Sequence, residues 1–266
     1  MDDLIMIKLG GSLITEKDNP LTPRLDVIQS LAGQLKEIRS REPNLKIILG
    51  HGSGSFGHSI AAKYQTRSGV KTDQDWYGFA QVWYAARDLN IFISQALRDQ
   101  DISFITIPPS AFIYSIDGKG ADHFKYPLKS LLSTQIMPVV HGDVIFDKHL
   151  GGTILSTEDI FLYLAKFYQP KKILLAGIEE AIWADFPTRH KPIKSITPKN
   201  FNKVKQEIGG SKSVDVTGGM IEKVRLMVEL VAKYPSIKVN IFSGLKPYSL
   251  IEEIFGDSAG TIIEME

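Results

Sequence analysis

Short runs of apolar residues alternate along the chain with longer segments in which apolar positions recur every three or four residues. The short runs predict strands at 4–9, 45–49, 103–107, 137–141, 144–146, 172–176, 238–242 and 260–263. The longer segments predict amphipathic helices at 25–38, 78–97, 160–167 and 220–232. Strands that alternate with helices are typical of an α/β fold, with a mainly parallel central sheet and helices on both faces.

The pattern is that of a single domain, 1–266, built from two lobes. We place the boundary between the lobes at Gln169-Pro170, which gives segments 1–169 and 170–266. The segments 118–127 and 184–210 are rich in Gly, Pro, Lys and polar residues and are expected to be mobile loops.

Composition narrows the class of protein. The 266 residues are 43% hydrophobic and 23% charged, which suits a folded chain with a large core. A net charge of +1 gives no electrostatic reason to expect a nucleic-acid or membrane partner. The absence of cysteine excludes disulfides, thiolate metal sites and a cysteine nucleophile. No apolar stretch approaches the ~20 residues that span a bilayer, so we expect a soluble, cytoplasmic protein.

The first candidate site follows the first strand. Lys8 ends the apolar run, and Gly10, Gly11 and Ser12 come directly after it. Glycines let backbone N–H groups approach an anion closely because no Cβ is in the way. The stretch is therefore either an anion-binding loop, with Lys8 reaching the same anion, or a plain turn between strand and helix.

The second candidate site, Gly50–His58, contains four glycines and follows the second strand. So many glycines cost backbone entropy unless a close approach or a positive φ is needed, which favours a phosphate-binding loop. From Gly52 to Gly57 the stretch also matches G-x-G-x-x-G, a dinucleotide-binding pattern. In that pattern an acidic residue follows at the end of a strand ~20 residues later, and the segment 71–76 does not resemble the end of a strand. A nicotinamide-dependent oxidoreductase is kept as an alternative.

The third candidate site is Thr217–Lys223, at the start of a predicted helix. Gly218 and Gly219 are poor helix formers, and Lys223 in the second turn gains nothing from the helix dipole. A bound polyphosphate would account for these features, although Lys223 alone could be an ordinary solvated lysine. There is no Walker A motif, so a kinase must use lysines and amides from several loops.

Taken together, these motifs resemble the amino acid kinase superfamily in order and spacing. Within it, the resemblance to isopentenyl phosphate kinases is carried by Ser12–Lys17, His51–His58, positions 78–90 and Pro138–Val144. The similarity extends over almost the whole chain. It implies an open αβα sandwich whose first lobe binds a phosphorylated acceptor and whose second lobe binds ATP. Mg²⁺, a small-molecule phosphate substrate and a homodimer are also implied.

The resemblance assigns roles by position. The implied catalytic residues are Lys8, Lys223, His58 and Glu158. The implied ATP-binding residues are Lys8, Gly10, Gly11, Ser12, Lys17, Gly177, Gly218, Gly219 and Lys223. The implied acceptor-binding residues are Gly54, Ser55, Gly57, His58, Trp83, Ala86, Asp143 and Gly152. Gly10, Gly11, Gly54 and Gly57 would offer backbone amides. Trp83 and Ala86 fit either a pocket for a short prenyl tail or the core.

Two departures from the family pattern are visible. Glu158 lies where the family has an aspartate that orients the catalytic lysines, and residues 176–180 replace the family's T-D-V-D-G nucleotide loop. Two further alternatives follow: a kinase of another small phosphate or phosphonate, as in fosfomycin kinases, and a nucleotide-binding regulatory protein on the same fold. No carboxylate cage for a metal is visible in the sequence.

Overall fold

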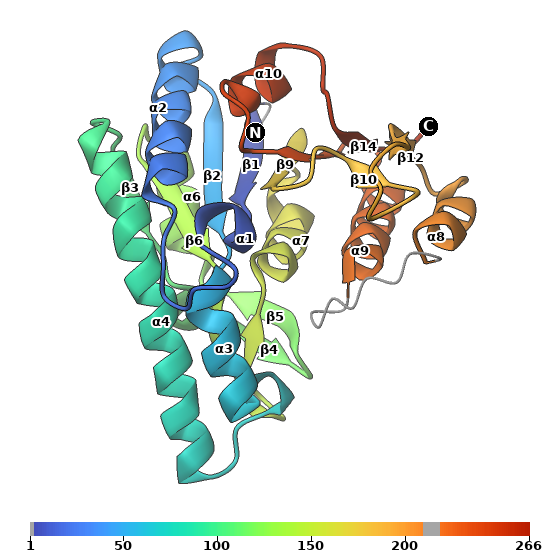
Figure 1. Ribbon diagram of the computed structural model, residues 1–266. Coiled ribbons are helices and arrows are strands. Elements are labelled where there is room, and N and C mark those ends of the chain that lie inside the picture. Colours follow the sequence, from blue (N-terminus) through green and yellow to red (C-terminus); the bar gives the residue numbers. More distant parts are fainter. Residues whose placement is uncertain (1–2, 210–218) are drawn as a thin grey trace.

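A single large sheet runs through the whole molecule in the computed structural model, which describes residues 3–209 and 219–266 (Figure 1). Its eight strands lie in the order β12-β14-β13-β9-β1-β2-β6-β3, and only β13 and β14 pair antiparallel. The strands in chain order are β1 (Leu4–Leu9), β2 (Lys46–His51), β3 (Phe104–Thr106), β6 (Met137–His141), β9 (Lys172–Gly177), β12 (Ser195–Ile196), β13 (Lys238–Ser243) and β14 (Thr261–Ile263).

Each predicted strand is present, with ends displaced by no more than two residues. The four predicted helices are also present, and each is longer than predicted. The expected α/β sandwich with a mainly parallel sheet is therefore confirmed. β1 lies between β2 and β9, where every one of its residues is buried, as a continuous apolar run predicts for a central parallel strand.

The two faces of the sheet are covered by different helices. Ile5, Ile7 and Leu9 of β1 pack against one set, and Leu4 and Met6 pack against the other. The first set is α2 (Leu25–Arg41), α4 (Asp73–Asp99) and α10 (Ser249–Phe255). The second set is α6 (Lys125–Leu132), α7 (Thr157–Tyr168), α8 (Phe201–Gly209) and α9 (Gly219–Lys233). Because strand side chains alternate, Lys8 emerges on the face of α7 and α9.

A second, four-stranded sheet lies beside the main one, in the order β5-β4-β7-β8. Its strands are β4 (Ile113–Ile116), β5 (Lys119–His123), β7 (Asp143–Asp147) and β8 (Gly151–Leu155). The sequence did not predict β4, β5 or β8. The carboxylate of Asp147 holds this sheet together, because it accepts hydrogen bonds from the Ser115 hydroxyl and from the amides of Gly118, His149 and Leu150.

The expectation of two mobile loops is wrong. Within 118–127, β5 pairs with β4 and α6 begins at Lys125. Within 184–210, the described residues form β11 (Pro192–Ile193), which pairs with β10 (Ile182–Trp183), then β12 and α8. Polar composition misled the prediction because these are edge and surface elements, whose exposed faces are polar. In the part of the chain that the structure describes, no helix is both long and apolar enough to cross a membrane.

Candidate active site

Three charged side chains meet at the carboxyl end of β1. Lys8 of β1 and Lys223 of α9 both contact the same oxygen, Oε1, of Glu158 in the first turn of α7. The Lys223 ammonium lies 3.5 Å from that oxygen, and Lys8 forms a closer ion pair. The expected contact of the residue at 158 with both lysines is thus confirmed. The elements that supply the three residues are far apart in sequence and adjacent around β1.

Burial differs across this cluster. The side chains of Lys8 and Glu158 are 11% and 9% exposed, whereas that of Lys223 is 38% exposed. Burial by itself raises the pKa of Glu158, but the charges of Lys8 and Lys223 and the hydrogen bond from Lys8 lower it to about 2. Burial, together with the charge of Lys223, lowers the pKa of Lys8, against the opposing effect of Glu158. Two ammonium groups thus share one carboxylate, and an arriving polyanion would find an unbalanced positive charge.

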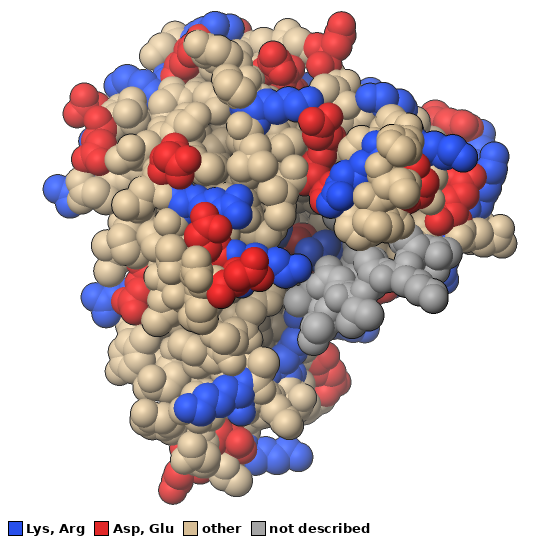
Figure 2. Space-filling model, in the orientation of Figure 1, with Lys and Arg blue, Asp and Glu red and all other residues tan. Residues whose placement is uncertain are grey.

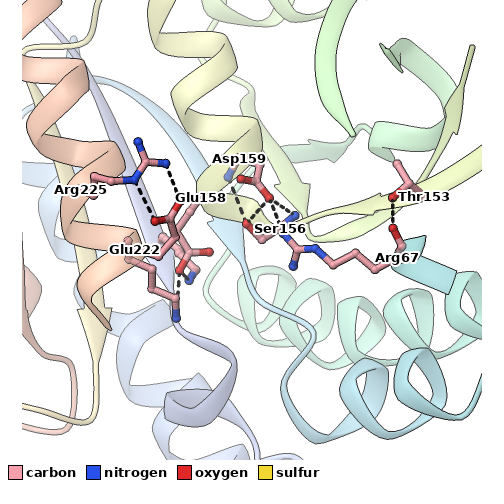
Figure 3. A network of polar contacts seen from close by, with 9 residues as sticks. Arg67, Thr153, Ser156, Glu158, Asp159, Glu222 and Arg225 are labelled. Atoms are coloured by element: carbon pink, nitrogen blue, oxygen red, sulfur yellow. Dashed lines mark hydrogen bonds and ion pairs between the residues drawn. The ribbon is translucent and has the colours of Figure 1, made fainter. Parts of the chain in front are cut away.

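Local sequence explains why Glu158 lies here. Ser156 is the N-cap of α7, and its hydroxyl accepts a hydrogen bond from the Asp159 amide while the Asp159 carboxylate accepts one from the Ser156 amide. This capping box fixes the start of the helix. Glu158 then falls in the first turn, where the helix dipole also favours a carboxylate. Figure 3 shows Glu158 and Asp159 pointing to different sides of this turn.

The first two glycine stretches pack against each other. A Cβ on Gly11 would lie 2.5 Å from the Gly54 amide nitrogen, and one on Gly52 would lie 2.7 Å from the Gly11 nitrogen. Gly54 has a φ of +48°. The Thr15 hydroxyl donates to the Gly11 carbonyl and accepts from the Ser55 amide, which ties the two stretches together. Backbone contact between the loops therefore requires these glycines, a reason that the sequence did not reveal.

Two of the expected amide donors are already used. The Gly10 amide donates to the Ala176 carbonyl at 2.8 Å, and the Gly57 amide donates to the Ser53 carbonyl at 3.2 Å. The expectation that these two amides face a ligand is therefore wrong in this structure. The physical reason is that Gly10 lies against β9 and Gly57 lies inside α3 (Gly54–Tyr64), where the backbone satisfies itself.

The other residues of the phosphate motifs lie on neighbouring elements, and their surroundings differ. His58 is exposed on α3, which begins within the stretch that we predicted as a loop. Ser12 is exposed on the short helix α1 (Gly11–Ile14), and Lys17 is exposed on the segment that follows it. A Cβ on Gly177 would meet nothing closer than 3.9 Å. Gly218 lies outside the described residues, and Gly219 is the first residue of α9.

The acceptor-side residues have mixed environments. Ala86 is 1% exposed and belongs to the core, whereas Trp83 is partly buried against a small apolar cluster that includes Val82. The Trp83 ring also contacts the Tyr84 ring and the Arg87 guanidinium. The indole therefore borders this cluster rather than lying in the core beneath it.

Gly152 and Asp143 are enclosed by other protein atoms. A Cβ on Gly152 would lie 2.7 Å from the ring of Phe79, so this glycine makes room for that ring. Asp143 is 1% exposed and accepts hydrogen bonds from the Ser110 hydroxyl and the Val144 amide. Burial raises the pKa of Asp143 to about 7, although these hydrogen bonds oppose the shift. In this conformation the carboxyl of Asp143 faces protein, not solvent.

One face of the molecule is hollowed. Figure 2 shows a depression between the broad part of the molecule and the smaller part beside it, with basic and acidic atoms along its edges. Among residues 3–209 and 219–266, no group of three or more His, Cys, Asp or Glu side chains is arranged to hold a metal ion.

Sequence reasoning missed one ion pair at this site. The guanidinium of Arg67 lies 3.6 Å from the carboxylate of Asp159, next to Glu158 (Figure 3). Arg67 is part of the 3₁₀ turn η1 (Thr66–Ser68), between α3 and α4. The spacing of Ser156 and Asp159 is a visible capping-box signal, but nothing in the sequence pointed from Asp159 to Arg67.

Comparison with known proteins agrees with this geometry. An isopentenyl phosphate kinase from Methanocaldococcus jannaschii is 32% identical, and the match covers 98% of each chain. Another from Haloferax volcanii is 31% identical and covers 99% of each chain. A solved structure of an isopentenyl phosphate kinase superposes with a TM-score of 0.81 at 24% identity, over 98% of this chain and all of that one, which shows the shared fold. The model of the amino acid kinase family matches residues 3–243, and the chain therefore belongs to that family.

Proposed function

We propose that this protein transfers the γ-phosphoryl group of ATP to isopentenyl phosphate and so forms isopentenyl diphosphate. The observation that carries the proposal is the meeting of Lys8 and Lys223 at Glu158, at the carboxyl end of the central strand. Two ammonium groups at one point suit a phosphoryl group in transfer, since enzymes catalyse this reaction mainly by positioning and charge neutralisation. The choice of acceptor is supported by the full-length relatives, which are isopentenyl phosphate kinases.

In this proposal the two lysines have different roles because their side chains differ in exposure. Lys8, rooted in β1 and nearly closed to solvent, holds a fixed position beside Glu158. Lys223 is more exposed and would approach the phosphoryl group from α9. Glu158 orients both and does not act as a base, because its pKa of about 2 keeps it ionised and weakly basic. An acceptor that is itself an oxyanion needs no strong base.

The acceptor and the nucleotide would lie on opposite sides of this cluster. The start of α3, with His58 and Ser55, would face the acceptor phosphate, and Lys17, Gly177 and the start of α9 would face ATP. Mg²⁺ would be held by the nucleotide phosphates and water. When bound, the ion would neutralise phosphate charge.

The test is a phosphorylation screen with isopentenyl phosphate, dimethylallyl phosphate, fosfomycin and amino acids, with Lys8→Ala and Lys223→Ala as comparison variants. We expect isopentenyl phosphate to be the best acceptor and each variant to lose on the order of 10²–10³ in kcat, because each removes a partner of transition-state charge. Fosfomycin as the preferred acceptor would replace the proposal with a phosphonate kinase. Near-native turnover by either variant would contradict the assignment of that lysine.

We further propose that the protein acts as a homodimer in the cytoplasm, as its family resemblance implies. Membership in the amino acid kinase family supports this proposal. Sedimentation velocity at micromolar concentration would give the mass of the particle, for which one chain weighs 29.6 kDa. Cell fractionation would give the location. A particle of one chain at all concentrations would contradict the dimer.

A further inference from the structure

We infer that Arg67 binds the phosphate of the acceptor and that its guanidinium contacts Asp159 only until the acceptor arrives. This inference rests on the proposed function, because it concerns the acceptor side of the same site. Arg67 lies in none of the glycine stretches and follows the end of α3. Its side chain extends from η1 toward the first turn of α7, as Figure 3 shows.

The backbone of Arg67 is fixed although its side chain is exposed. The buried hydroxyl of Thr153 on β8 donates to the Arg67 carbonyl at 2.9 Å, and the Val70 amide donates to the Leu150 carbonyl at 2.8 Å. The segment is thereby attached at two points to the hairpin of β7 and β8. The guanidinium, in contrast, belongs to a side chain that is 63% exposed. A fixed root with an accessible charged end is the arrangement expected of a ligand-binding arginine.

The contact with Asp159 is weak and easily exchanged. The same oxygen of Asp159, Oδ2, already accepts from the Ser156 amide at 2.9 Å and from the Ser156 hydroxyl at 2.7 Å. Arg67 is the third and most distant partner of this oxygen, at 3.6 Å, which exceeds hydrogen-bonding distance. A phosphate offers an arginine two parallel charge-assisted hydrogen bonds at shorter range. The exchange of Asp159 for a phosphate is therefore favourable.

The position of Arg67 matches the place where the acceptor must lie. Glu158 and Asp159 are consecutive, so their Cα atoms are about 3.8 Å apart, yet the first contacts the two lysines and the second contacts Arg67. The guanidinium is thus beside the transfer centre. Arg67 follows α3 in the chain, and α3 carries the proposed acceptor residues Ser55 and His58.

Charge balance calls for such a residue. Lys8, Lys223 and Glu158 together carry one net positive charge, which the γ-phosphate of ATP would more than neutralise. An acceptor phosphate then has to approach a second phosphate, and this repulsion rises steeply at short distance in a site of low dielectric. A further cation on the acceptor side offsets it. Arg67 is a cation on that side that reaches the first turn of α7.

The decisive experiment compares two ways of breaking the same ion pair. Arg67→Gln removes the cation, and Asp159→Asn removes its partner but keeps an acceptor for the helix cap. If Arg67 binds phosphate, Arg67→Gln raises the KM for isopentenyl phosphate on the order of 10-fold and leaves the KM for ATP within about twofold. Asp159→Asn leaves the acceptor KM unchanged or lowers it. If the pair only holds η1 against α7, the two variants behave alike, and the inference is overturned.

Two further variants and a binding measurement complete this comparison. Arg67→Lys should recover part of the loss, and Lys63→Gln, which removes a nearby exposed cation of α3, should have no effect. Calorimetric binding of isopentenyl phosphate in the presence of a non-hydrolysable ATP analogue gives the same comparison without turnover. An active wild type with an unaffected Arg67→Gln variant contradicts only this inference. A wild type that binds isopentenyl phosphate without phosphorylating it contradicts the proposed function, and the binding constants of the variants then decide the role of Arg67.

Discussion

Lys8 of β1 and Glu158 of α7 form an ion pair that is almost closed to solvent. The pair exists because alternation along β1 turns Lys8 toward the face that α7 covers, and because the capping box of α7 places Glu158 in its first turn. Lys223 joins from the more exposed side. The site is thus a buried carboxylate in contact with two lysines.

Glu158 should be essential as a carboxylate but not as a glutamate. Glu158→Ala leaves Lys8 buried without its partner, so we expect kcat to fall by ~10²-fold or more, with lower stability. Glu158→Asp should retain or improve activity, because the family uses an aspartate here. Glu158→Gln, which keeps the shape without the charge, should resemble Glu158→Ala in kcat. Steady-state kinetics and thermal melting check this, and a kinetically silent Glu158→Ala would assign the orienting role to another group.

His58 should make the acceptor site selective for a phosphate. A hydrogen bond to a charged group contributes ~1.5–3 kcal/mol, so His58→Ala should cost roughly 10–150-fold in kcat/KM for isopentenyl phosphate. His58→Gln retains an N–H donor and should recover part of the loss. The KM for ATP should hardly change. Unchanged acceptor kinetics with weakened ATP binding would mean that the start of α3 serves the nucleotide and that the two lobes exchange roles.

Trp83 should limit the length of the acceptor. Its indole borders the apolar cluster of α4 and the second sheet, and each further buried CH₂ could contribute ~0.8 kcal/mol if there were room. Trp83→Ala should therefore raise the relative kcat/KM for longer prenyl phosphates. Ile91→Ala, at an exposed apolar residue of the same helix α4, is the control and should leave the profile unchanged. If Trp83→Ala gives the same chain-length profile as the wild type, the indole serves only packing.

Gly11 should tolerate no side chain. A Cβ there would lie 2.5 Å from the Gly54 nitrogen and 2.6 Å from its Cα, and both belong to backbone that cannot rotate away. Gly11→Ala should cost ~1–3 kcal/mol in the free energy of unfolding and should lower kcat/KM by displacing the start of α3. Gly33→Ala on α2, where nothing lies within 4 Å, should instead stabilise the protein by up to ~1 kcal/mol. Equal stabilities of the two variants in urea would refute the packing argument.

The buried histidine pair should make stability depend on pH on the acid side. The rings of His51 and His141 stack with centroids 5.2 Å apart. Burial lowers the pKa of both, and together with the nearby His51 it lowers that of His141 to about 3. The unfolded chain therefore binds more protons below pH 6.5, the ordinary value. Above this pH the two neutral rings should not reduce the free energy of unfolding. As the pH drops toward about 3, the free energy of unfolding should fall by at most ~1.4 kcal/mol per pH unit for each ring.

Urea unfolding of the wild type and of His141→Gln at pH 7.0, 5.5 and 4.5 measures this effect. The variant lacks one of the two titrating rings, so its stability should fall less steeply with acid. Parallel curves for the two proteins would show that His141 does not contribute to the acid sensitivity.

The sequence by itself determined the order of the strands and helices and the identity of the two lysines. The apolar run 4–9 could only be a buried strand, and the spacing in 78–97 could only be one face of a helix, because these patterns depend on local periodicity. The place of Glu158 could also be predicted from the sequence, since the family motif sets its position relative to the helix start. Of the second sheet only β7 was predicted, because its short strands and polar edges carry weak periodicity.

Only the tertiary structure decided what the glycines and Arg67 contact. Gly11 and Gly54 belong to different loops, and their contact depends on the parallel pairing of β1 with β2, which brings both loops to the same edge of the sheet. The hydrogen bond that uses the Gly10 amide likewise depends on the parallel pairing of β1 with β9, whereas the Gly57 amide bonds locally to Ser53 at the start of α3. Arg67 meets Asp159 only because η1 packs on β8, the strand that directly precedes α7. Contacts between residues so distant in sequence leave no local pattern, since they are fixed by packing rather than by periodicity.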